Sequence, residues 1–326
     1  ELRTRILETA TSLGYAGPDP TARGLAKGTT GTVGIMLTDS LALAFEDEIA
    51  ARFVGAIAGE LAPTGLALTL LTSTDEGDRI PARDVALDGA LVYSCDHRSG
   101  AVDWLIRRGL PLVFVDQRPR PGYDSVNIDD HEGARLAAEH VVGLGHRRIG
   151  VITGALGGPV GLLEDPSEAS ANPVGHARLT GWLAGVEGSG AVVHIVQAAE
   201  FGEPAGRFGA ELLLDLDEPP TAILCIADLV AYGVVQVAAE RGLAIPDDLS
   251  VVGFDGTQLA ARMNPALTTV RQDVEAKGRA AAQALVRSIA GGGPRSRAKR
   301  TMLPVELVVG ASTAPPRRRE RRTTES

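Results

Sequence analysis

Apolar residues recur in short, uninterrupted runs from Thr32 onwards, and segments with helical periodicity lie between them. The expected strands, in chain order, are TVGIML (32–37), LALTLL (66–71), GALVYS (89–94), PLVFVD (111–116), SVNI (125–128), RIGVIT (148–153), AVVHIV (191–196), TAILCI (221–226) and LSVVGF (249–254). The runs are continuous in Val, Ile and Leu rather than alternating with polar residues. This pattern is typical of parallel strands that helices cover on both faces.

The intervening segments, such as EDEIAARFVGAIAGELA (46–62) and DLVAYGVVQVAAERG (228–242), keep apolar residues three and four positions apart. Strand and helix alternate in this way both before and after about residue 145. The pattern predicts an α/β protein with two doubly wound parallel-sheet lobes and a ligand cleft between them. A further helix (273–292) and a late strand, PVELVV (304–309), indicate that the chain crosses between the lobes three times, which would give a hinge.

The pattern also predicts where the lobes divide. The expected ranges are 1–29 for an N-terminal appendage, 30–144 with 273–292 for the N-terminal lobe, 145–272 with 300–312 for the C-terminal lobe, and 313–326 for a disordered basic tail. The segment GGGPRSRAKR (291–300) is expected to be a flexible connection.

Composition supports a soluble, cytoplasmic protein with real cores. The chain has 326 residues, of which 44% are hydrophobic and 22% charged. No run approaches the roughly 18 apolar residues that a membrane span needs, and the start, ELRTRILETA, lacks an apolar signal core. Cys95 and Cys225 lie in or beside apolar runs, so we expect reduced thiols rather than a disulfide.

Charge is distributed unevenly along the chain. The net charge is −9, yet the last fourteen residues hold five Arg and two Glu, and residues 1–29 hold four basic and three acidic side chains. The body between these ends is therefore more acidic than the chain as a whole. An acidic surface repels the phosphates of nucleic acid, so any contact with DNA must come from an end of the chain.

Signatures of catalysis, metal binding or cofactor binding are poor. The glycine-rich stretches GTTGTVG (28–34) and GVITGALGG (150–158) lack the Lys-Ser/Thr of a phosphate loop and a clean dinucleotide fingerprint. The six histidines are scattered, and no spacing of Cys and His fits a metal site. We therefore expect no enzyme activity, no metal and no cofactor.

Polar side chains at the carboxyl ends of the expected strands are more informative. Asp116 ends one strand, Asp228 follows a second, Asp255 follows a third, and Arg178 lies just inside a helix start. Helix capping and local ion pairing could explain each of them singly. Together they suit a ligand with many hydroxyl groups, because carboxylates and guanidinium forks fix such groups. Phe201 could supply an apolar face for a ring, although core packing would equally explain it.

The segment PTARGLAKG (20–28) predicts a short basic helix with one exposed leucine, ahead of the first lobe. This segment and four others resemble the LacI/GalR family of bacterial transcription regulators. The stretches that carry the resemblance, in family order, are RILETATSLGYAGPDPTARGLAKGTTGTVGIML (5–37), LGHRRIGVITG (144–154), RLTGW (178–182), IPDDLSVVGFDG (245–256) and PALTTVRQD (265–273).

The resemblance implies a periplasmic-binding-protein-like core behind a DNA-binding headpiece, and a homodimer whose paired hinge helices enter the minor groove of operator DNA. Residues 1–29 would hold a headpiece remnant and the hinge helix, with Ala22, Arg23, Leu25 and Lys27 at the DNA. Leu25 would be wedged between base steps. The resemblance also assigns Asp116, Arg178, Phe201, Asp228 and Asp255 to a small-molecule effector, expected to be a sugar or related polyol.

Three departures from the family pattern bear on these expectations. Residues 2–13 resemble the third headpiece helix, so the two helices before it are expected to be missing. YAGPDP (15–20) has an extra residue and Asp19 in place of Asn, which could shift the hinge register. The segment ALGGPVGLLEDPSEASANPVGHA (155–177) is longer than usual and could act as a lid.

Two other classes of function stay open. A sugar-binding protein of the transport type shares the two-lobed fold, but the hinge segment and the lack of an export signal count against it. An enzyme acting on a sugar or nucleoside in the cleft would need a general acid and base within reach of one atom. No pair of carboxylates stands out for that role in the sequence.

Overall fold

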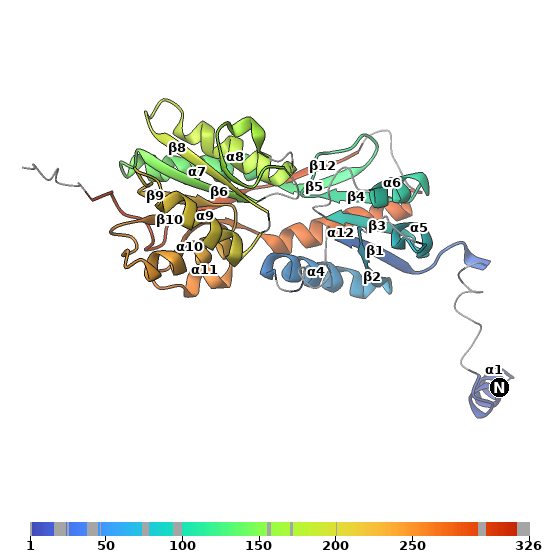
Figure 1. Ribbon diagram of the computed structural model, residues 1–326. Coiled ribbons are helices and arrows are strands. Elements are labelled where there is room, and N and C mark those ends of the chain that lie inside the picture. Colours follow the sequence, from blue (N-terminus) through green and yellow to red (C-terminus); the bar gives the residue numbers. More distant parts are fainter. Residues whose placement is uncertain are drawn as a thin grey trace, which may run out of the picture.

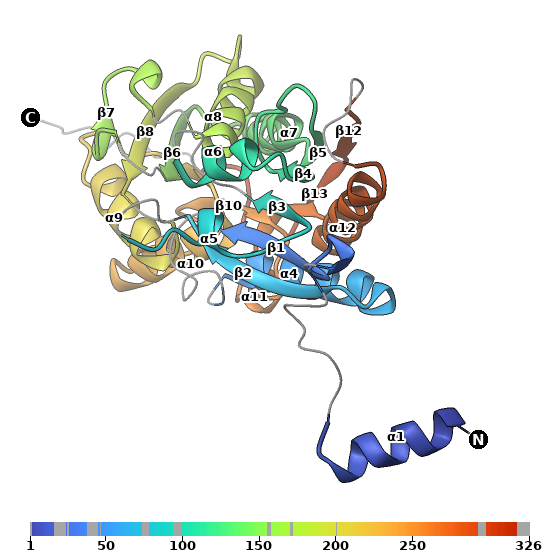
Figure 2. The same ribbon diagram turned by 90° about the vertical axis from the view of Figure 1, so that its right-hand side faces the viewer.

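Two α/β lobes lie side by side, and the chain passes between them three times (Figure 1). The computed structural model describes residues 2–15, 24, 26–37, 45, 47–73, 78–93, 100–154, 158–169, 172–199, 201–292 and 298–317. Helix α1 (Leu2–Ser12) lies apart from both lobes in Figures 1 and 2.

The N-terminal lobe is built on a six-stranded sheet in which all neighbouring strands are parallel. Its spatial order is β12 (Arg300–Leu303), β5 (Asp124–Ile128), β4 (Leu112–Val115), β3 (Gly89–Tyr93), β1 (Thr32–Leu37) and β2 (Ala67–Thr72). Two separate apolar clusters lie on its two faces. One contains α4 (Glu48–Leu61) and α12 (Val274–Ala290), and the other contains α5 (Pro81–Asp84) and α6 (Gly100–Arg107).

The C-terminal lobe has a seven-stranded sheet with a parallel centre and an antiparallel strand at each edge. Its spatial order is β13 (Val305–Val308), β11 (Thr268–Gln272), β10 (Ser250–Asp255), β9 (Ala222–Cys225), β6 (Arg148–Gly154), β8 (Val192–Ala198) and β7 (Gly161–Leu163). The helices pack as two pairs, α7 (Asp130–Gly143) with α8 (Pro173–Val186), and α9 (Glu203–Leu214) with α10 (Asp228–Glu240) (Figure 2). Short helices are η1 (Ala62–Thr64), η2 (Pro166–Glu168) and α11 (Gln258–Arg262).

The predicted fold class is confirmed, and all nine runs expected as strands from 32–254 form strands. Expected strand 304–309 is β13. Three strands were not expected: β7, β11 and β12. Each is short or rich in polar residues, as in TTVRQ for β11, so it lacks the apolar run that identifies a buried strand.

The first crossing lies at Asp129 instead of the expected boundary between residues 144 and 145. Helix α7 buries Ala134, Ala138 and Val141 in the core of the C-terminal lobe. Because α7 follows β5 of the N-terminal lobe directly, the chain changes lobe at the helix start, where the Asp129 carboxylate accepts the amide of Glu132 at 3.1 Å. The segment expected in the C-terminal lobe over 300–312 is also divided, since β12 pairs with β5 in the N-terminal sheet.

The beginning of the expected disordered tail is packed against the C-terminal lobe. The imidazole of His146, 1% exposed, lies with Nε2 2.9 Å from the carbonyl oxygen of Ala314. Arg317 pairs with Asp247 at 2.6 Å and Asp248 at 2.9 Å. The expectation of disorder from residue 313 is therefore wrong for residues 313–317, and residues 318–326 lie outside the described part of the chain.

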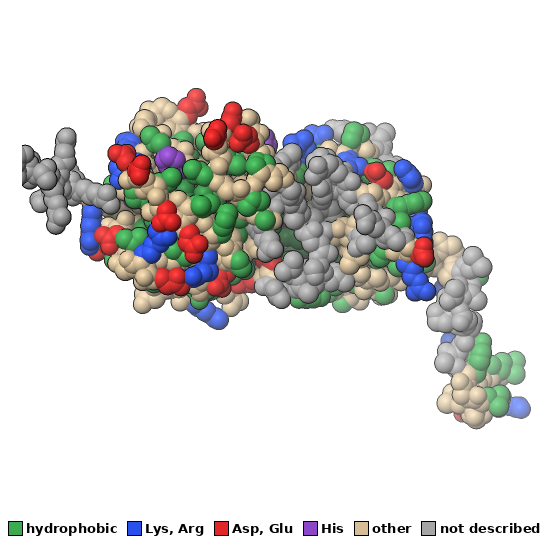
Figure 3. All heavy atoms as spheres, viewed as in Figure 1, with side chains coloured by type: hydrophobic (Ala, Val, Ile, Leu, Met, Phe, Trp, Pro, Cys, Tyr) green, Lys and Arg blue, Asp and Glu red, His purple; other side chains and the backbone are tan. Residues whose placement is uncertain are grey.

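The described surface mixes charges of both signs. Figure 3 shows Asp and Glu side chains interspersed with Lys and Arg over the C-terminal lobe, so the described residues on this face form no continuous basic surface. None of the described helices is long and apolar enough to cross a membrane. Cys225 is a buried free thiol, as expected, and Cys95 lies outside the described residues.

Glycines on α8 let it approach α7 closely. A Cβ atom on Gly181 would lie 2.2 Å from the carbonyl oxygen of His131, and one on Gly185 would lie 2.6 Å from that of Arg135. A backbone oxygen cannot turn aside as a flexible side chain can. The close approach also brings Arg178 on α8 to the start of α7, where it contacts Asp130.

Replacing Gly181 with Ala should therefore destabilise the protein by about 1–3 kcal/mol, because the two helices must move apart. Gly59→Ala is the matched control, since Gly59 is an exposed glycine inside α4 and a Cβ atom there would have no neighbour within 4 Å. That change should be neutral or stabilise by about 0.5–1 kcal/mol through helix propensity. Urea unfolding followed by circular dichroism measures both, and equal stabilities would contradict the close-packing argument.

Candidate functional site

Two aspartates at strand ends are held in an uncommon backbone conformation. Asp116 directly follows β4 of the N-terminal lobe, and Asp255 is the last residue of β10 in the C-terminal lobe. Their φ angles are 52° and 117°, and no other non-glycine residue in the described ranges has positive φ. Residues other than glycine adopt such backbone angles only at a cost in free energy, and backbone strain of this kind is concentrated at functional sites. The structure thus singles out two of the five residues predicted to contact a ligand.

A buried lysine holds Asp116 from within its own lobe. Lys277, on α12, is 1% exposed, and its Nζ donates to Asp116 Oδ2 at 2.5 Å and to Gln272 Oε1 at 2.8 Å. The ammonium also lies 5.8 Å from the ring centre of Phe53 and 5.6 Å from that of Tyr93. Both carboxylate and aromatic faces stabilise a buried cation.

The same contacts continue into the C-terminal lobe. Gln272, at the end of β11, donates through Nε2 to Asp255 Oδ1 at 2.8 Å. Arg178 lies 3.5 Å from the same oxygen and donates to Asp130 Oδ1 at 2.8 Å. Asp116, Lys277, Gln272, Asp255, Arg178 and Asp130 therefore form one continuous set of buried contacts, which we call the junction network.

Arg178 is fixed on every side. Besides its two carboxylate partners it donates to the carbonyl oxygen of Ile226, and its guanidinium carbon lies 3.6 Å from the ring centre of Phe254. A planar guanidinium stacked on a ring and held by an aspartate has little freedom to turn. The site therefore presents Arg178 in one preset orientation.

Asp228 has a different environment. It is fully buried, and its carboxylate accepts from the amide of Thr257 at 2.7 Å, the hydroxyl of Thr257 at 2.9 Å and the hydroxyl of Thr269 at 2.5 Å. A Cβ on Gly253 would lie 2.3 Å from Asp228 Oδ1, so glycine is required there. These contacts fix the turn that follows Asp255, and a direct contact between Asp228 and a ligand stays a prediction.

None of the contacts of the junction network involves the remaining residues that were predicted to bind the effector or DNA. Phe201 lies just before α9 and is 44% exposed. Lys27 is exposed within a short helical stretch. Ala22, Arg23 and Leu25 lie outside the described residues, so their assignment to DNA stays a prediction from the resemblance.

Sequence reasoning missed Lys277, Gln272 and Asp130. One signal was present for Lys277, because in VEAKGRAAAQAL it falls at apolar spacing from Val274 and Ala281, both of which are buried. A lysine on the apolar face of a helix needs a buried partner. Nothing in the local sequence, however, indicates that this partner is Asp116, which lies far away in the chain.

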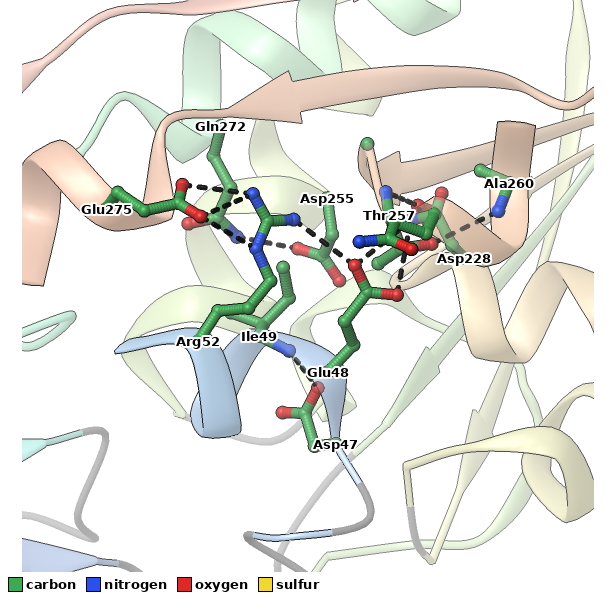
Figure 4. Close-up of polar contacts among 12 residues, drawn as sticks. Asp47, Glu48, Ile49, Arg52, Asp228, Asp255, Thr257, Ala260, Gln272 and Glu275 are labelled. Carbon is green, nitrogen blue, oxygen red and sulfur yellow. Dashed lines mark hydrogen bonds and ion pairs between the residues drawn. The ribbon is translucent and has the colours of Figure 1, made fainter. Parts of the chain in front are cut away.

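A second polar contact joins the lobes beside the junction network. Figure 4 shows Glu48, at the start of α4, reaching the beginning of α11, where it accepts from the amide of Gln258 at 3.0 and 3.1 Å. Arg52 pairs with Glu48 at 3.2 Å and with Glu275 of α12 at 2.8 Å. Glu48 thus connects the N-terminal lobe to a backbone amide of the C-terminal lobe.

Burial disfavours the charged forms of several carboxylates here. It raises the pKa of Asp255 to about 8, with the nearby Arg178 opposing the shift and the charges of Asp228 and Asp47 adding to it. Burial likewise raises the pKa values of Asp47 and Asp130. Among the described residues, no group of three or more His, Cys, Asp and Glu is arranged to hold a metal ion.

The raised pKa of Asp255 makes the stability of the fold depend on pH. Between roughly pH 4 and pH 8 the folded protein holds a proton that the unfolded chain has released, so this group's contribution to stability falls as the pH rises. Asp255→Asn carries no charge at any pH. The thermal midpoint of the variant minus that of the unmodified protein should therefore increase as the pH is raised from 5 to 8.5. Thermal unfolding monitored by circular dichroism measures both midpoints. Parallel curves would show that Asp255 is ionised throughout.

A family model, related sequences and solved structures all place this chain in the same family. Residues 138–313 match the model for a periplasmic binding protein-like domain. An HTH-type transcriptional regulator of Mycolicibacterium smegmatis is 34% identical over 97% of this chain and 89% of its own length. The crystal structure of a LacI family transcriptional regulator from Corynebacterium glutamicum is 28% identical, covers 96% of this chain and 90% of its own, and has a TM-score of 0.76.

A LacI family transcriptional regulator from Enterococcus faecalis, solved with bound ribose, has a TM-score of 0.71. It covers 87% of this chain and 99% of its own, and at 24% identity it shows likeness of fold alone. The two-lobed architecture, the family model and the relatives agree. The chain belongs to the LacI family of transcriptional regulators.

Proposed function

We propose that this protein is a cytoplasmic homodimeric repressor whose affinity for operator DNA is set by a small carbohydrate or related polyol bound between its lobes, and that it is not an enzyme. The observation that carries the proposal is the junction network. It brings buried hydrogen-bonding groups from both lobes to the ends of β4 and β10, where ligands bind in folds of this type. The ribose complex of a regulator with the same fold supports this choice of ligand class.

Effector binding would act by shifting the population of lobe arrangements. A ligand that contacts both Asp116 and Asp255 favours whichever arrangement brings them to their best distance, in proportion to its differential affinity. Because a short helix is marginally stable in isolation, small changes in the spacing of two N-terminal lobes can decide whether paired hinge helices form on DNA. Leu25 and Arg23 would then enter the minor groove, with Ala22 and Lys27 beside them.

Removing Arg178 tests the effector site. Arg178→Ala should weaken binding of a sugar effector by roughly 100-fold or more, since truncating a buried charged partner costs that much. Arg207→Ala is the matched control, because Arg207 lies in the same lobe and pairs on the surface with Glu240 at 2.8 Å. Isothermal titration calorimetry measures both, with near-ultraviolet circular dichroism as a check on folding. Unchanged affinity in the Arg178 variant would remove the effector from this position.

The DNA half of the proposal rests on Leu25. In a chain carrying a complete helix-turn-helix unit upstream, Leu25→Ala should weaken binding to a palindromic operator by roughly tenfold or more, because the wedge between base steps is lost. Binding to a scrambled duplex, which depends on phosphate contacts, should be unchanged and should keep its salt dependence. Fluorescence anisotropy on both duplexes measures the difference. An equal loss on both would contradict the wedge assignment.

A further inference from the structure

One carboxylate oxygen at the junction has been left without a partner. Asp116 is 8% exposed, and its Oδ2 accepts from Lys277. Its Oδ1 is buried and accepts no hydrogen bond, alone among the buried side-chain oxygens and nitrogens of the described residues. A buried polar atom without a partner costs free energy, so in a native structure it calls for an explanation, and a bound group that donates to it is one.

Both cations of the junction are already committed. Lys277 is held by Asp116 and Gln272. Arg178 is held by Asp130, Asp255 and the carbonyl oxygen of Ile226. Each cation is therefore already paired with a carboxylate of the junction.

Carboxylates, in contrast, are in surplus. Asp47 caps α4 by accepting from the amide of Ile49 at 2.9 Å, and it forms no ion pair with any described residue. Its charge nevertheless acts on Asp255 and Tyr93. Even with Asp255 protonated below pH 8, the described carboxylates whose charges act on the junction outnumber its two cations, Lys277 and Arg178; they are Asp47, Asp116, Asp130 and Asp228.

We infer that the effector is a neutral or cationic polyhydroxylated compound that donates a hydrogen bond to Asp116 Oδ1, and that its phosphorylated counterparts are rejected. This inference rests on the proposed effector site and narrows its ligand class. A hydroxyl or ammonium group supplies the missing donor, whereas a phosphate brings only acceptors and negative charge into a place where carboxylates are in excess. Lys277 is the positioning residue: it occupies Oδ2 and leaves Oδ1 for the ligand.

The test uses matched pairs of ligands. Ribose, glucose, sorbitol and glucosamine are compared with ribose 5-phosphate, glucose 6-phosphate, sorbitol 6-phosphate and glucosamine 6-phosphate, by thermal unfolding and then calorimetry. A non-phosphorylated member should bind at least roughly 100-fold more tightly than its phosphate, and Arg178→Ala should weaken that binding by roughly 100-fold or more. Tighter binding of a phosphate, still sensitive to Arg178→Ala, would overturn the inference and leave the proposed function standing. Failure of every member of both sets would overturn both.

A single substitution then tests the role of Asp116 directly. Asp116→Asn removes one negative charge and leaves Lys277 without its carboxylate, so the preference for the non-phosphorylated member should fall by roughly tenfold or more. Asp124→Asn is the matched control, because Asp124 is an equally buried aspartate at the start of β5, where it accepts from the amide of Lys299 at 2.7 Å. The ratio of two affinities is insensitive to a partial loss of folded protein. An unchanged ratio in Asp116→Asn would contradict the assignment.

Discussion

The ion pair between Lys277 and Asp116 is the interaction on which the arrangement at the lobe junction depends. Lys277 is 1% exposed, and breaking a buried ion pair by removing one partner leaves an uncompensated buried charge that costs several kcal/mol. Lys277 also holds Gln272, Gln272 holds Asp255, and Asp255 faces Arg178. Each of these side chains therefore limits the orientation of the next one. Because the contacts run from one lobe to the other, replacing one side chain affects the contacts of its neighbours in both lobes.

The fold supplies these partners through two of its three crossings. The first crossing leads from β5 into α7 and provides Asp130, and the second leads from β11 into α12 and provides Gln272 and Lys277. A hinge made of crossing segments would ordinarily be free to bend. Here the segments carry charged groups that are paired and buried, so we expect the junction to favour a few discrete arrangements over a continuous range.

In the proposed function, this organisation joins ligand recognition to regulation. A transcriptional regulator needs a ligand to change an equilibrium between arrangements, and a ligand can do so only through contacts that differ between them. The unpartnered oxygen of Asp116 and the strained ends of β4 and β10 lie where a ligand would touch both lobes. Glu48 adds a further link between the lobes through α11, away from the strand ends.

The sequence by itself determined the fold class, the positions of most strands, and the places of Asp116 and Asp255 at strand ends and of Arg178 near a helix start. Apolar runs and strand-end residues are local signals, and parallel α/β folds place strand ends together. The five stretches that resemble the LacI/GalR family carried the functional class in the same way.

Only the tertiary structure decided which groups meet. In the structure, α7 belongs to the C-terminal lobe and β12 to the N-terminal sheet. Asp228 accepts hydrogen bonds from Thr257 and Thr269, and Lys277 is the partner of Asp116. These outcomes depend on contacts between residues far apart in the chain. No local sequence pattern predicts these contacts. The free-energy cost of a buried charge depends on its partner, and that partner can come from a distant part of the chain.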